Sequence, residues 1–246
     1  MSQPVVLVTG CSTGFGRLLV EPLADAGYTV FASMRDPDGK NAGPAAELRQ
    51  LGHRGVHVLR LDVTSDAEVD AAIRQIEREA GRLDVLVNNA GCMYGGVTEA
   101  FSVKEFDDQF QTNVIGLFRV TRAALPMMRR QQSGLLVHLS SIVGRVSPPF
   151  FGAYSASKWA VDALGESLRY ELAPLGVDSV IVEPAPFKTS LFAQARTPQD
   201  TARAAEYGPT AAIPGQLFAA FDQMFAGMPA ETDPTHVIDA IMRLIR

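Results

Sequence analysis

A tyrosine and a lysine that could perform acid–base chemistry stand four residues apart, at Tyr154 and Lys158. If residues 154–170 are helical, this spacing puts the phenol and the ammonium on one face of the helix, where the cation favours the phenolate. A free tyrosine titrates near about 10, so a fixed positive charge is needed for proton exchange near neutrality. The pair alone is weak evidence, because such pairs also occur on solvated helix faces.

A glycine-rich turn near the start of the chain could bind phosphate. The sequence Thr9-Gly-Cys-Ser-Thr-Gly-Phe-Gly16 follows a short apolar run at 4–9. Glycine lets the backbone approach a pyrophosphate, and the N-terminus of a following helix supplies N–H donors and partial positive charge. The spacing of Gly10, Gly14 and Gly16 differs from that of the ordinary dinucleotide fingerprint, so the position of the turn between a strand and a helix carries the argument.

The end of the second apolar run bears on which dinucleotide is bound. NAD-binding folds tend to place an acid about 20 residues after the glycine turn, where it bonds the ribose 2′-hydroxyl. Here that place holds Met34, followed by Arg35, and Asp36 lies two residues beyond Met34. A guanidinium beside Ser12 suits the 2′-phosphate of NADP, since arginine and phosphate form charge-assisted bonds. We therefore predict NADP(H), the alternative being that Arg35 is an exposed turn residue.

The elements that would position these residues alternate along the chain. Short apolar runs, typical of strands buried on both faces, lie at 4–9, 28–33, 56–61, 84–88, 135–139 and 178–182. Helical stretches lie between them at 14–26, 44–51, 65–80, 103–131 and 154–174. This alternation predicts an α/β fold, a single-domain Rossmann-type doubly wound parallel sheet of six or seven strands with helices on both faces. Pro22 and Pro126 fall inside two of the helices and are expected to kink them.

The alternating pattern ends after Pro184. Residues 185–235 mix Phe, Met, Ala, Pro and Gly without a steady period, and a final amphipathic helix follows at about 234–245. A long irregular insertion in a compact domain is usually functional, and this one follows the end of a strand, where ligands of open α/β sheets bind. We predict one dinucleotide-binding and catalytic domain over 1–246, with 185–235 as a substrate-binding loop and lid.

Composition and charge exclude several classes of function. The net charge is −5 and the basic residues are scattered, which disfavours a nucleic-acid partner. No apolar run reaches the length of about 18 residues expected of a membrane span, and the chain begins without a basic leader, so we expect a soluble, cytoplasmic protein with no membrane partner. Cys11 and Cys92 are expected to be reduced, and the four histidines lack ligand spacing, so no metal is expected.

Several motifs together resemble the short-chain dehydrogenase/reductase family. In chain order they are Thr9-Gly-x-x-x-Gly-x-Gly16, Asp62-Val63, Asn88-Asn-Ala-Gly91, Asn113, Ser141 and Tyr154-x-x-x-Lys158. Within the family, Thr-Gly-Cys-Ser followed by Met-Arg-Asp resembles the branch of 17β-hydroxysteroid and retinol dehydrogenases and its bacterial relatives.

This resemblance implies a role for each motif. Tyr154 would be the general acid or base, Ser141 would orient the substrate carbonyl, and Lys158 would bind the nicotinamide ribose and lower the pKa of the tyrosine. Asn113 would bend its helix and position a water that connects Lys158 to solvent. The cofactor would be held by Gly10, Ser12, Thr13, Gly14, Phe15, Gly16, Arg35, Asp62, Val63, Asn89, Ala90, Gly91, Tyr154, Lys158, Phe187 and Thr189.

Each motif also has an ordinary structural explanation. Asn88 and Asn89 could simply end a strand, Asp62 could cap the helix that begins near 65, and the two serines at 140–141 could be turn residues. It is less credible that all of these explanations hold at once for residues that stand in the same order as the motifs of the family.

The sequence departs from the family pattern in two places. Pro184-Ala-Pro186 replaces the usual Pro-Gly, and alanine resists positive φ, so the loop that holds Phe187 and Thr189 is expected to be stiffer or differently shaped. The usual seventh strand is missing before the chain stops at Arg246, so either the sheet has six strands or the sequence is a truncated version.

These features predict an NADP(H)-dependent carbonyl reductase or secondary-alcohol dehydrogenase acting on a small apolar carbonyl or alcohol substrate. The rivals are an NAD(H)-dependent alcohol dehydrogenase and a dinucleotide-sensing protein without turnover. The residues expected to surround the substrate, which could equally be packing or dimer residues, are Phe150, Phe151, Phe187, Leu191, Phe192, Leu217, Phe218, Phe221, Met224 and Phe225. We also expect a homodimer or homotetramer formed through the helices at 103–131 and 154–174.

Overall fold

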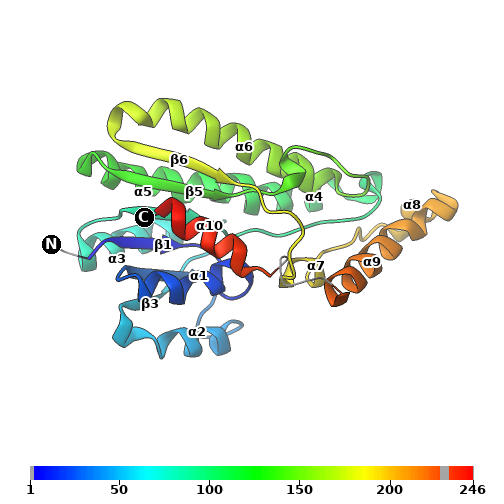
Figure 1. Ribbon diagram of the computed structural model, residues 1–246. Helices are drawn as coiled ribbons and strands as arrows, with labels where there is room; N and C mark the ends of the chain where they lie inside the picture. The colour runs from blue at the N-terminus through cyan, green and yellow to red at the C-terminus, as the bar shows by residue number, and fades with distance from the viewer. Residues whose placement is uncertain (1–2, 228–232, 246) are drawn as a thin grey trace.

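Six parallel strands form one sheet in the computed structural model, which describes residues 3–227 and 233–245 apart from the Asp222 side chain. The strand order is β3-β2-β1-β4-β5-β6 (Figure 1). The strands are β1 (Val5–Val8), β2 (Thr29–Met34), β3 (Val56–Arg60), β4 (Val85–Asn88), β5 (Gly134–Leu139) and β6 (Val177–Val182). The predicted doubly wound α/β sheet is therefore confirmed.

Helices cover both faces of the sheet. One face carries α1 (Gly14–Asp25), α2 (Ala42–Arg49) and α10 (Thr235–Ile245), and the other carries α3 (Asp66–Ala80), α5 (Gly116–Gln131) and α6 (Gly152–Leu172). Val6 and Val8 of β1 pack into the first core, whereas Val5 and Leu7 pack into the second, because successive side chains of a strand point to opposite faces. This two-sided burial explains why the strands are continuous apolar runs.

The stretch at 103–131 is not one regular helix. α4 (Val103–Phe110) is joined to α5 by a π-helical turn at Gln111–Ile115, and Asn113 lies at the centre of that turn. Single π turns inside helices are rare and are frequent at functional sites. The expected bend at Asn113 is thus present in the form of a widened turn.

The segment after Pro184 differs from its prediction, because much of it is helical. It contains α7 (Ser190–Ala193), α8 (Thr201–Ala205) and the 15-residue α9 (Ile213–Gly227), while 228–232 lie outside the described residues. These helices lie beyond the carboxyl ends of the strands (Figure 1). Leu217, Phe221 and Phe225 repeat at intervals of four residues, a helical signal that the mixed composition obscured.

Smaller differences concern helix ends and turns. α2 and α6 each begin two residues before the predicted start, and neither Pro22 nor Pro126 ends its helix. Ala185 is not among the residues with positive φ, so the Pro-Ala-Pro segment carries no such strain. The 3-10 turns are Gly52–Arg54, Thr98–Ala100, Ile142–Gly144, Ala173–Leu175 and Gly208–Ala212.

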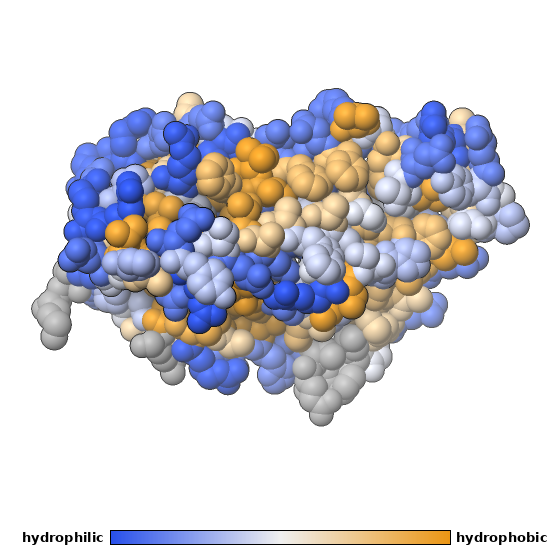
Figure 2. Space-filling view, turned by 90° about the horizontal axis from the view of Figure 1, so that it is seen from above, coloured by the Kyte–Doolittle hydropathy of each residue, from blue (hydrophilic) through white to orange (hydrophobic). Residues whose placement is uncertain are grey.

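The surface above α6 carries exposed apolar residues. Figure 2 looks down on this side of the molecule and shows a band of apolar residues across it. Large apolar side chains exposed on α4, α5 and α6 include Phe106, Phe118 and Trp159. None of the helices in the described part of the chain is long and apolar enough to cross a membrane.

Candidate active site

The candidate site is a cavity of about 740 Å³ at the carboxyl ends of the strands. β1 and β4 are neighbours in the sheet but not in the chain, and the strand order reverses between them. Open α/β sheets bind ligands in the crevice at such a switch point. The glycine turn after β1 lines one end of the cavity, and Tyr154 of α6 lines the other.

The glycine turn leaves room for a ligand next to the backbone. Gly10 has φ of +74°, a conformation that favours glycine. A Cβ on Gly16 would lie 2.4 Å from Asn89 Nδ2 and 2.6 Å from the carbonyl oxygen of Gly10. Thr13 is the N-cap of α1, yet its side chain makes no capping hydrogen bond, so it leaves the first N–H groups of that helix uncapped. An uncapped helix start beside a close-packed glycine turn suits a pyrophosphate.

Hydrogen bonds fix the ends of β1 and β4 to each other. The backbone N–H groups of Asn89 and Ala90 both donate to Thr9 Oγ1, each at 3.0 Å. The Asn89 amide in turn donates to the carbonyls of Thr9 at 2.8 Å and Gly10 at 3.1 Å. Asn89, the residue directly after β4, therefore holds the shape of the glycine turn in addition to lining the cavity.

The adenosine end of the cavity is lined by Met34, Arg35, Lys40, Asp62 and Val63, among others. The side chain of Arg35 is exposed and makes no hydrogen bond or ion pair within the described residues. Asp62 does not cap α3, since its Oδ1 accepts from the N–H of Thr64 at 2.9 Å, and Ser65 is the N-cap instead. The capping alternative for Asp62 is therefore wrong.

Asp36, the acid that follows Met34 and Arg35 in the chain, points its carboxylate away from this end. Its Oδ2 accepts from the backbone N–H of Lys40 at 2.7 Å, and its Oδ1 lies 3.5 Å from the Arg60 guanidinium. Asp36 is not among the residues that line the cavity. The position where NAD-binding folds place their acid is thus filled by the buried side chain of Met34.

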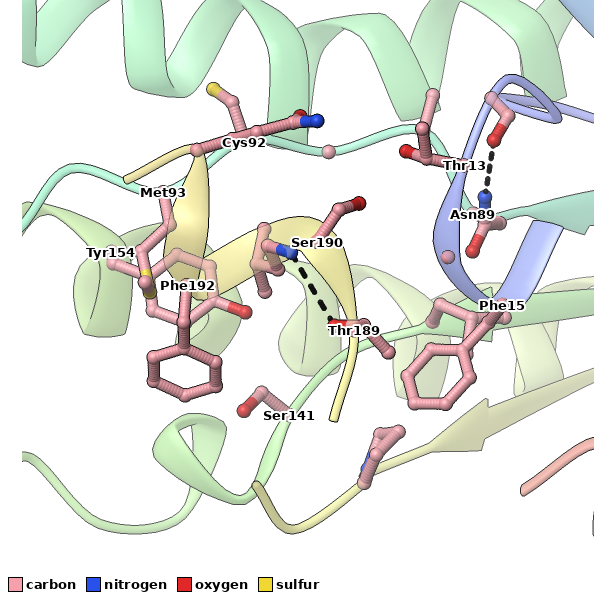
Figure 3. A pocket seen from close by; sticks show the side chains of 18 of the residues that line it. Thr13, Phe15, Asn89, Cys92, Met93, Ser141, Tyr154, Thr189, Ser190 and Phe192 are labelled. Carbon is pink, nitrogen blue, oxygen red and sulfur yellow. Dashed lines mark hydrogen bonds between the residues drawn. The ribbon is translucent and has the colours of Figure 1, made fainter. Parts of the chain in front are cut away.

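Tyr154 is buried and lies beside Ser141, as Figure 3 also shows. Burial raises the pKa of the Tyr154 phenol above its ordinary value, and a hydrogen bond with Ser141 acts in the opposite direction. Ser141 is the N-cap of the turn at 142–144, which orients its hydroxyl. Ser140 also lines the cavity, but its hydroxyl donates to the carbonyl of Lys158 at 3.4 Å.

Lys158 is buried, and its ammonium donates to the carbonyl of Leu139 at 2.7 Å. Its Nζ is 5.7 Å from the centre of the Tyr154 ring. Burial lowers the pKa of Lys158 to about 8, because its charged form loses hydration. The expected lowering of the tyrosine pKa by Lys158 is not seen, since burial of the phenol dominates and the ammonium is bonded to a backbone carbonyl.

Asn113 ties the π turn to the site. Its Oδ1 accepts from the backbone N–H of Cys92 at 2.9 Å, and its Nδ2 donates to the Cys92 carbonyl at 3.0 Å and to Ser157 Oγ at 3.1 Å. These bonds join the π turn, the segment after β4 and the first part of α6. Asn113 is thus close to the tyrosine and lysine, but all its described bonds are structural.

The segment after β6 covers the side of the cavity where the sequence analysis places the nicotinamide. Phe187 and Thr189 both line the cavity, and the Phe187 ring meets Phe15 edge to face at 6.1 Å. Thr189 caps the short helix α7 by accepting from the N–H of Leu191. In Figure 3 the stretch at 189–190 crosses the cavity between Phe15 and Tyr154. All of the predicted cofactor residues except Gly16 therefore line one cavity.

The substrate end has apolar walls. Met93, Phe151 and Tyr154 form a buried cluster against which α7 and α9 pack, and Figure 3 shows Met93 and Phe192 next to Tyr154. Of the aromatic and aliphatic residues predicted to surround the substrate, those that line the cavity are Phe151, Phe187, Leu191, Phe192, Leu217 and Phe221. Phe150, Phe218, Met224 and Phe225 do not, because Phe218 and Phe225 pack behind the first layer and Met224 is exposed.

Some lining residues escaped the sequence analysis. Lys40, Asn41, Cys92, Met93 and Arg196 all contribute to the cavity wall. Met93 follows the Asn-Asn-Ala-Gly motif by two residues, so its proximity to the strand end was a usable signal. Arg196 comes from the segment between α7 and α8, and nothing in its local sequence indicates that it reaches the site.

Comparison with known proteins shows to which family this chain belongs. Residues 4–200 match the short chain dehydrogenase family, and the chain belongs to it. A solved short chain dehydrogenase/reductase from Burkholderia phymatum in complex with NAD is similar, with a TM-score of 0.84 at 27% identity, over 99% of this chain and 86% of that one. The glycine turn, the open start of α1 and the cavity of this chain fit a nicotinamide dinucleotide.

Two curated relatives refine the comparison. The chain is 36% identical over 189 residues to 3-ketodihydrosphingosine reductase of Bacteroides thetaiotaomicron, covering 77% of this chain and 66% of that protein. It is 38% identical over 196 residues to retinol dehydrogenase 8 of Homo sapiens, covering 77% and 62%. The matched part spans about two thirds of the length of these relatives. The predicted resemblance to retinol dehydrogenase-like members is confirmed.

Proposed function

We propose that this protein is an NADP(H)-dependent oxidoreductase that interconverts a ketone or aldehyde and the corresponding alcohol, with Tyr154 as the general acid or base. The observation that carries the proposal is the position of Tyr154, which lies beside Ser141 where the apolar substrate walls meet the dinucleotide-binding end. In such an arrangement a substrate oxygen can lie against a proton donor and a hydrogen-bonding hydroxyl at once.

Each residue of the site has a separate role in the proposed reaction. The bound nicotinamide would supply the hydride for the carbonyl carbon, or accept it in the oxidative direction. Tyr154 gives its proton to the carbonyl oxygen in reduction and takes it back in oxidation. Ser141 orients that oxygen by hydrogen bonding. Lys158 holds the nicotinamide ribose through its ammonium.

NADP(H) is the preferred cofactor in this proposal. Arg35 and Lys40 both line the adenosine end, and neither forms an ion pair within the described residues. A 2′-phosphate would give both cations a partner, whereas NAD would find no carboxylate at Met34 to bond its 2′-hydroxyl. The similar structure that contains NAD makes NAD(H) the cofactor to test against.

The apolar walls support a substrate with a substantial apolar part. The name of the Bacteroides relative, 3-ketodihydrosphingosine reductase, also describes a ketone on a long-chain compound. We further propose that 1–246 is a single domain, in which 185–235 forms the substrate loop and lid. Residues 190–227 of that segment pack against the apolar cluster, while 228–232 are outside the described part of the chain.

We propose self-association through the face formed by α4, α5 and α6. Phe118 and Trp159 are 44% and 49% exposed there, and large exposed apolar side chains grouped on one face are typical of an interface. A second copy related by a two-fold axis would cover them on both subunits. Light scattering at micromolar concentration should give a dimer or tetramer, and a monomer would contradict this part of the proposal.

Turnover with a panel of ketones tests the main proposal. Oxidation of NADPH by the wild type should be compared with that of Tyr154→Phe, which removes the transferable proton and keeps the ring. The rate should fall by about 10²–10⁴-fold while NADPH affinity stays near the wild-type value. Tyr170→Phe is the matched control, because Tyr170 lies on the same helix but is 81% exposed. Equal rates for the two variants, or no turnover of any ketone by the wild type with either cofactor, would sink the proposal.

A further inference from the structure

The cavity is lined by four cationic side chains and one carboxylate, although the protein as a whole has a net charge of −5. The cations are Arg35, Lys40, Lys158 and Arg196, and the carboxylate is Asp62. None of the four cations forms an ion pair within the described residues. Many arginines outside the cavity do pair, for example Arg49 with Asp38 at 2.7 Å and Arg203 with Glu99 at 3.1 Å.

Three of these cations already have a partner in the proposed function. Arg35 and Lys40 lie at the adenosine end, and Lys158 binds the nicotinamide ribose. Arg196 remains, and it lies at the other end of the cavity among apolar residues. These include Met93, Leu191, Phe192, Leu217 and Phe221. Arg196 is exposed to solvent and lines the cavity without an ionic partner among the described residues, so its guanidinium is available to an anionic group of a ligand.

The backbone and side chain of Arg196 are both held in place. Its N–H donates to the Met93 carbonyl at 2.9 Å, and its own carbonyl accepts from the N–H of Gly95 at 2.9 Å. The guanidinium lies over the Tyr94 ring, 5.3 Å from its centre, and Nη1 donates to the Tyr94 hydroxyl at 2.7 Å. The Tyr94 side chain thus orients the guanidinium, and its hydroxyl uses one of the five N–H donors.

Arg196 has no carboxylate bonded to it within the described residues. Asp108 acts on its charge from a distance, but that carboxylate is itself bonded to Lys104 at 3.0 Å and 3.2 Å. Arg196 and Lys158 both act electrostatically on the Cys92 thiol, lowering its pKa against the larger effect of burial. Arg35 acts on that thiol in the same way, and all three cations line the one cavity.

We propose that Arg196 binds a carboxylate on the substrate, so that the preferred substrates are oxo or hydroxy acids with an apolar chain. The inference rests on the proposed oxidoreductase function, and it narrows the substrate class at the same site. The free donors of the guanidinium would bond the carboxylate oxygens, while the aromatic and aliphatic wall would hold the chain. Arg196 would thus be a specificity-determining residue that takes no part in hydride or proton transfer.

Ligand binding tests this without turnover. Straight-chain carboxylates and primary alcohols of matched length are titrated by calorimetry into the wild type saturated with NADPH. The wild type should bind the carboxylate more tightly than the alcohol. Arg196→Gln should lose roughly 10- to 100-fold in carboxylate affinity and little in alcohol affinity, since a charge-assisted hydrogen bond is lost.

Two further variants separate charge from structure. Arg196→Lys keeps a cation and should retain part of the preference for the carboxylate. Arg203→Gln removes another exposed arginine from the same segment, outside the cavity wall, and should change nothing. Equal weakening of carboxylate and alcohol in Arg196→Gln would make Arg196 a support for Tyr94 and overturn the inference. A wild type without any preference for carboxylates would overturn it too.

Turnover measurements then distinguish a failure of the carboxylate-site inference from a failure of the proposed oxidoreductase function. For oxo acids and their methyl esters, the ratio of kcat/KM values should fall roughly tenfold or more in Arg196→Gln. Turnover of both classes with a ratio that Arg196→Gln leaves unchanged would refute the carboxylate site and leave the oxidoreductase standing. Absence of turnover with any ketone would refute the oxidoreductase, while the binding titration would still report on Arg196.

Discussion

The two ends of the cavity are formed by different parts of the protein, one mainly by backbone and the other mainly by side chains. The cofactor end is made by strand ends and a glycine turn, and its shape depends on backbone contacts such as those of Asn89 with Thr9 and Gly10. The substrate end is made by side chains that α7 and α9 bring onto Met93 and Phe151. A backbone site tolerates little change and can be shared by a whole family, whereas a side-chain wall can be rebuilt for each substrate.

Lys158 lies where the two ends meet, and its burial should be visible in the stability of the folded protein. Its pKa is lowered from 10.5 to about 8, so between these values the unfolded chain binds more protons than the folded one. The free energy of unfolding should therefore rise with pH in this window, by about 2 to 3 kcal/mol relative to Lys158→Met. Denaturant titrations of both proteins at a series of pH values measure this difference.

The opposite sign would show that Lys158 gains stabilisation from its charge in the folded state. Tyr154 acts in the other direction at higher pH, because its raised pKa makes the folded protein hold a proton longer. Measurements up to about pH 10 keep the lysine effect separate, since a free tyrosine titrates near about 10.

Gly16→Ala should damage the cofactor end alone. The new Cβ would overlap Asn89 and the Gly10 carbonyl, so the turn must shift. Overpacking of this kind costs about 1–3 kcal/mol, and we expect NADPH affinity to fall roughly 100-fold. Fluorescence titration of NADPH checks this. Gly43→Ala is the matched control, because nothing lies within 4 Å of its added Cβ; equal losses in the two variants would contradict the steric explanation.

Arg35→Ala should distinguish NADPH from NADH at the cofactor end. Loss of a charge-assisted bond to the 2′-phosphate should weaken NADPH by roughly 10- to 100-fold and leave NADH nearly unchanged. The ratio of kcat/KM for the two cofactors measures the preference, with Arg74→Ala, an exposed arginine outside the cavity, as the control. If Arg35→Ala affects both cofactors alike, Arg35 is only a surface turn residue.

Phe221→Ala should damage the substrate end alone, and by the smallest factor. Phe221 lines the cavity and packs on Phe192 with ring centres 4.8 Å apart. Removing its buried area should raise KM for a long-chain ketone about tenfold, with NADPH affinity unchanged. Met224→Ala is the control on the same helix, since Met224 is 38% exposed and lines no part of the cavity. A change in NADPH affinity would show that the two ends are not independent.

The fold was largely predictable because its signals are local. Each strand is a short apolar run that is buried on both faces, and each crossover helix has its own apolar stripe, so order and type could be inferred without any contact information. The segment at 185–227 was the main exception. α9 is rich in Ala and Phe and is stabilised by packing on Phe151 and Phe192, and such tertiary stabilisation outweighs composition.

The sequence by itself indicated most of the residues at the cofactor end, since the glycine turn, the residues after β4 and the Tyr154 and Lys158 pair have fixed spacings along single elements. It did not indicate Lys40 or Asn41. Only the tertiary structure decided which side chains form the substrate end. Phe221 reaches the cavity and Phe225 packs behind it, although both are on α9. Arg196 joins the wall because its backbone pairs with the segment after β4 about 100 residues earlier in the chain. Contacts at that separation depend on how the elements pack, which no local pattern records.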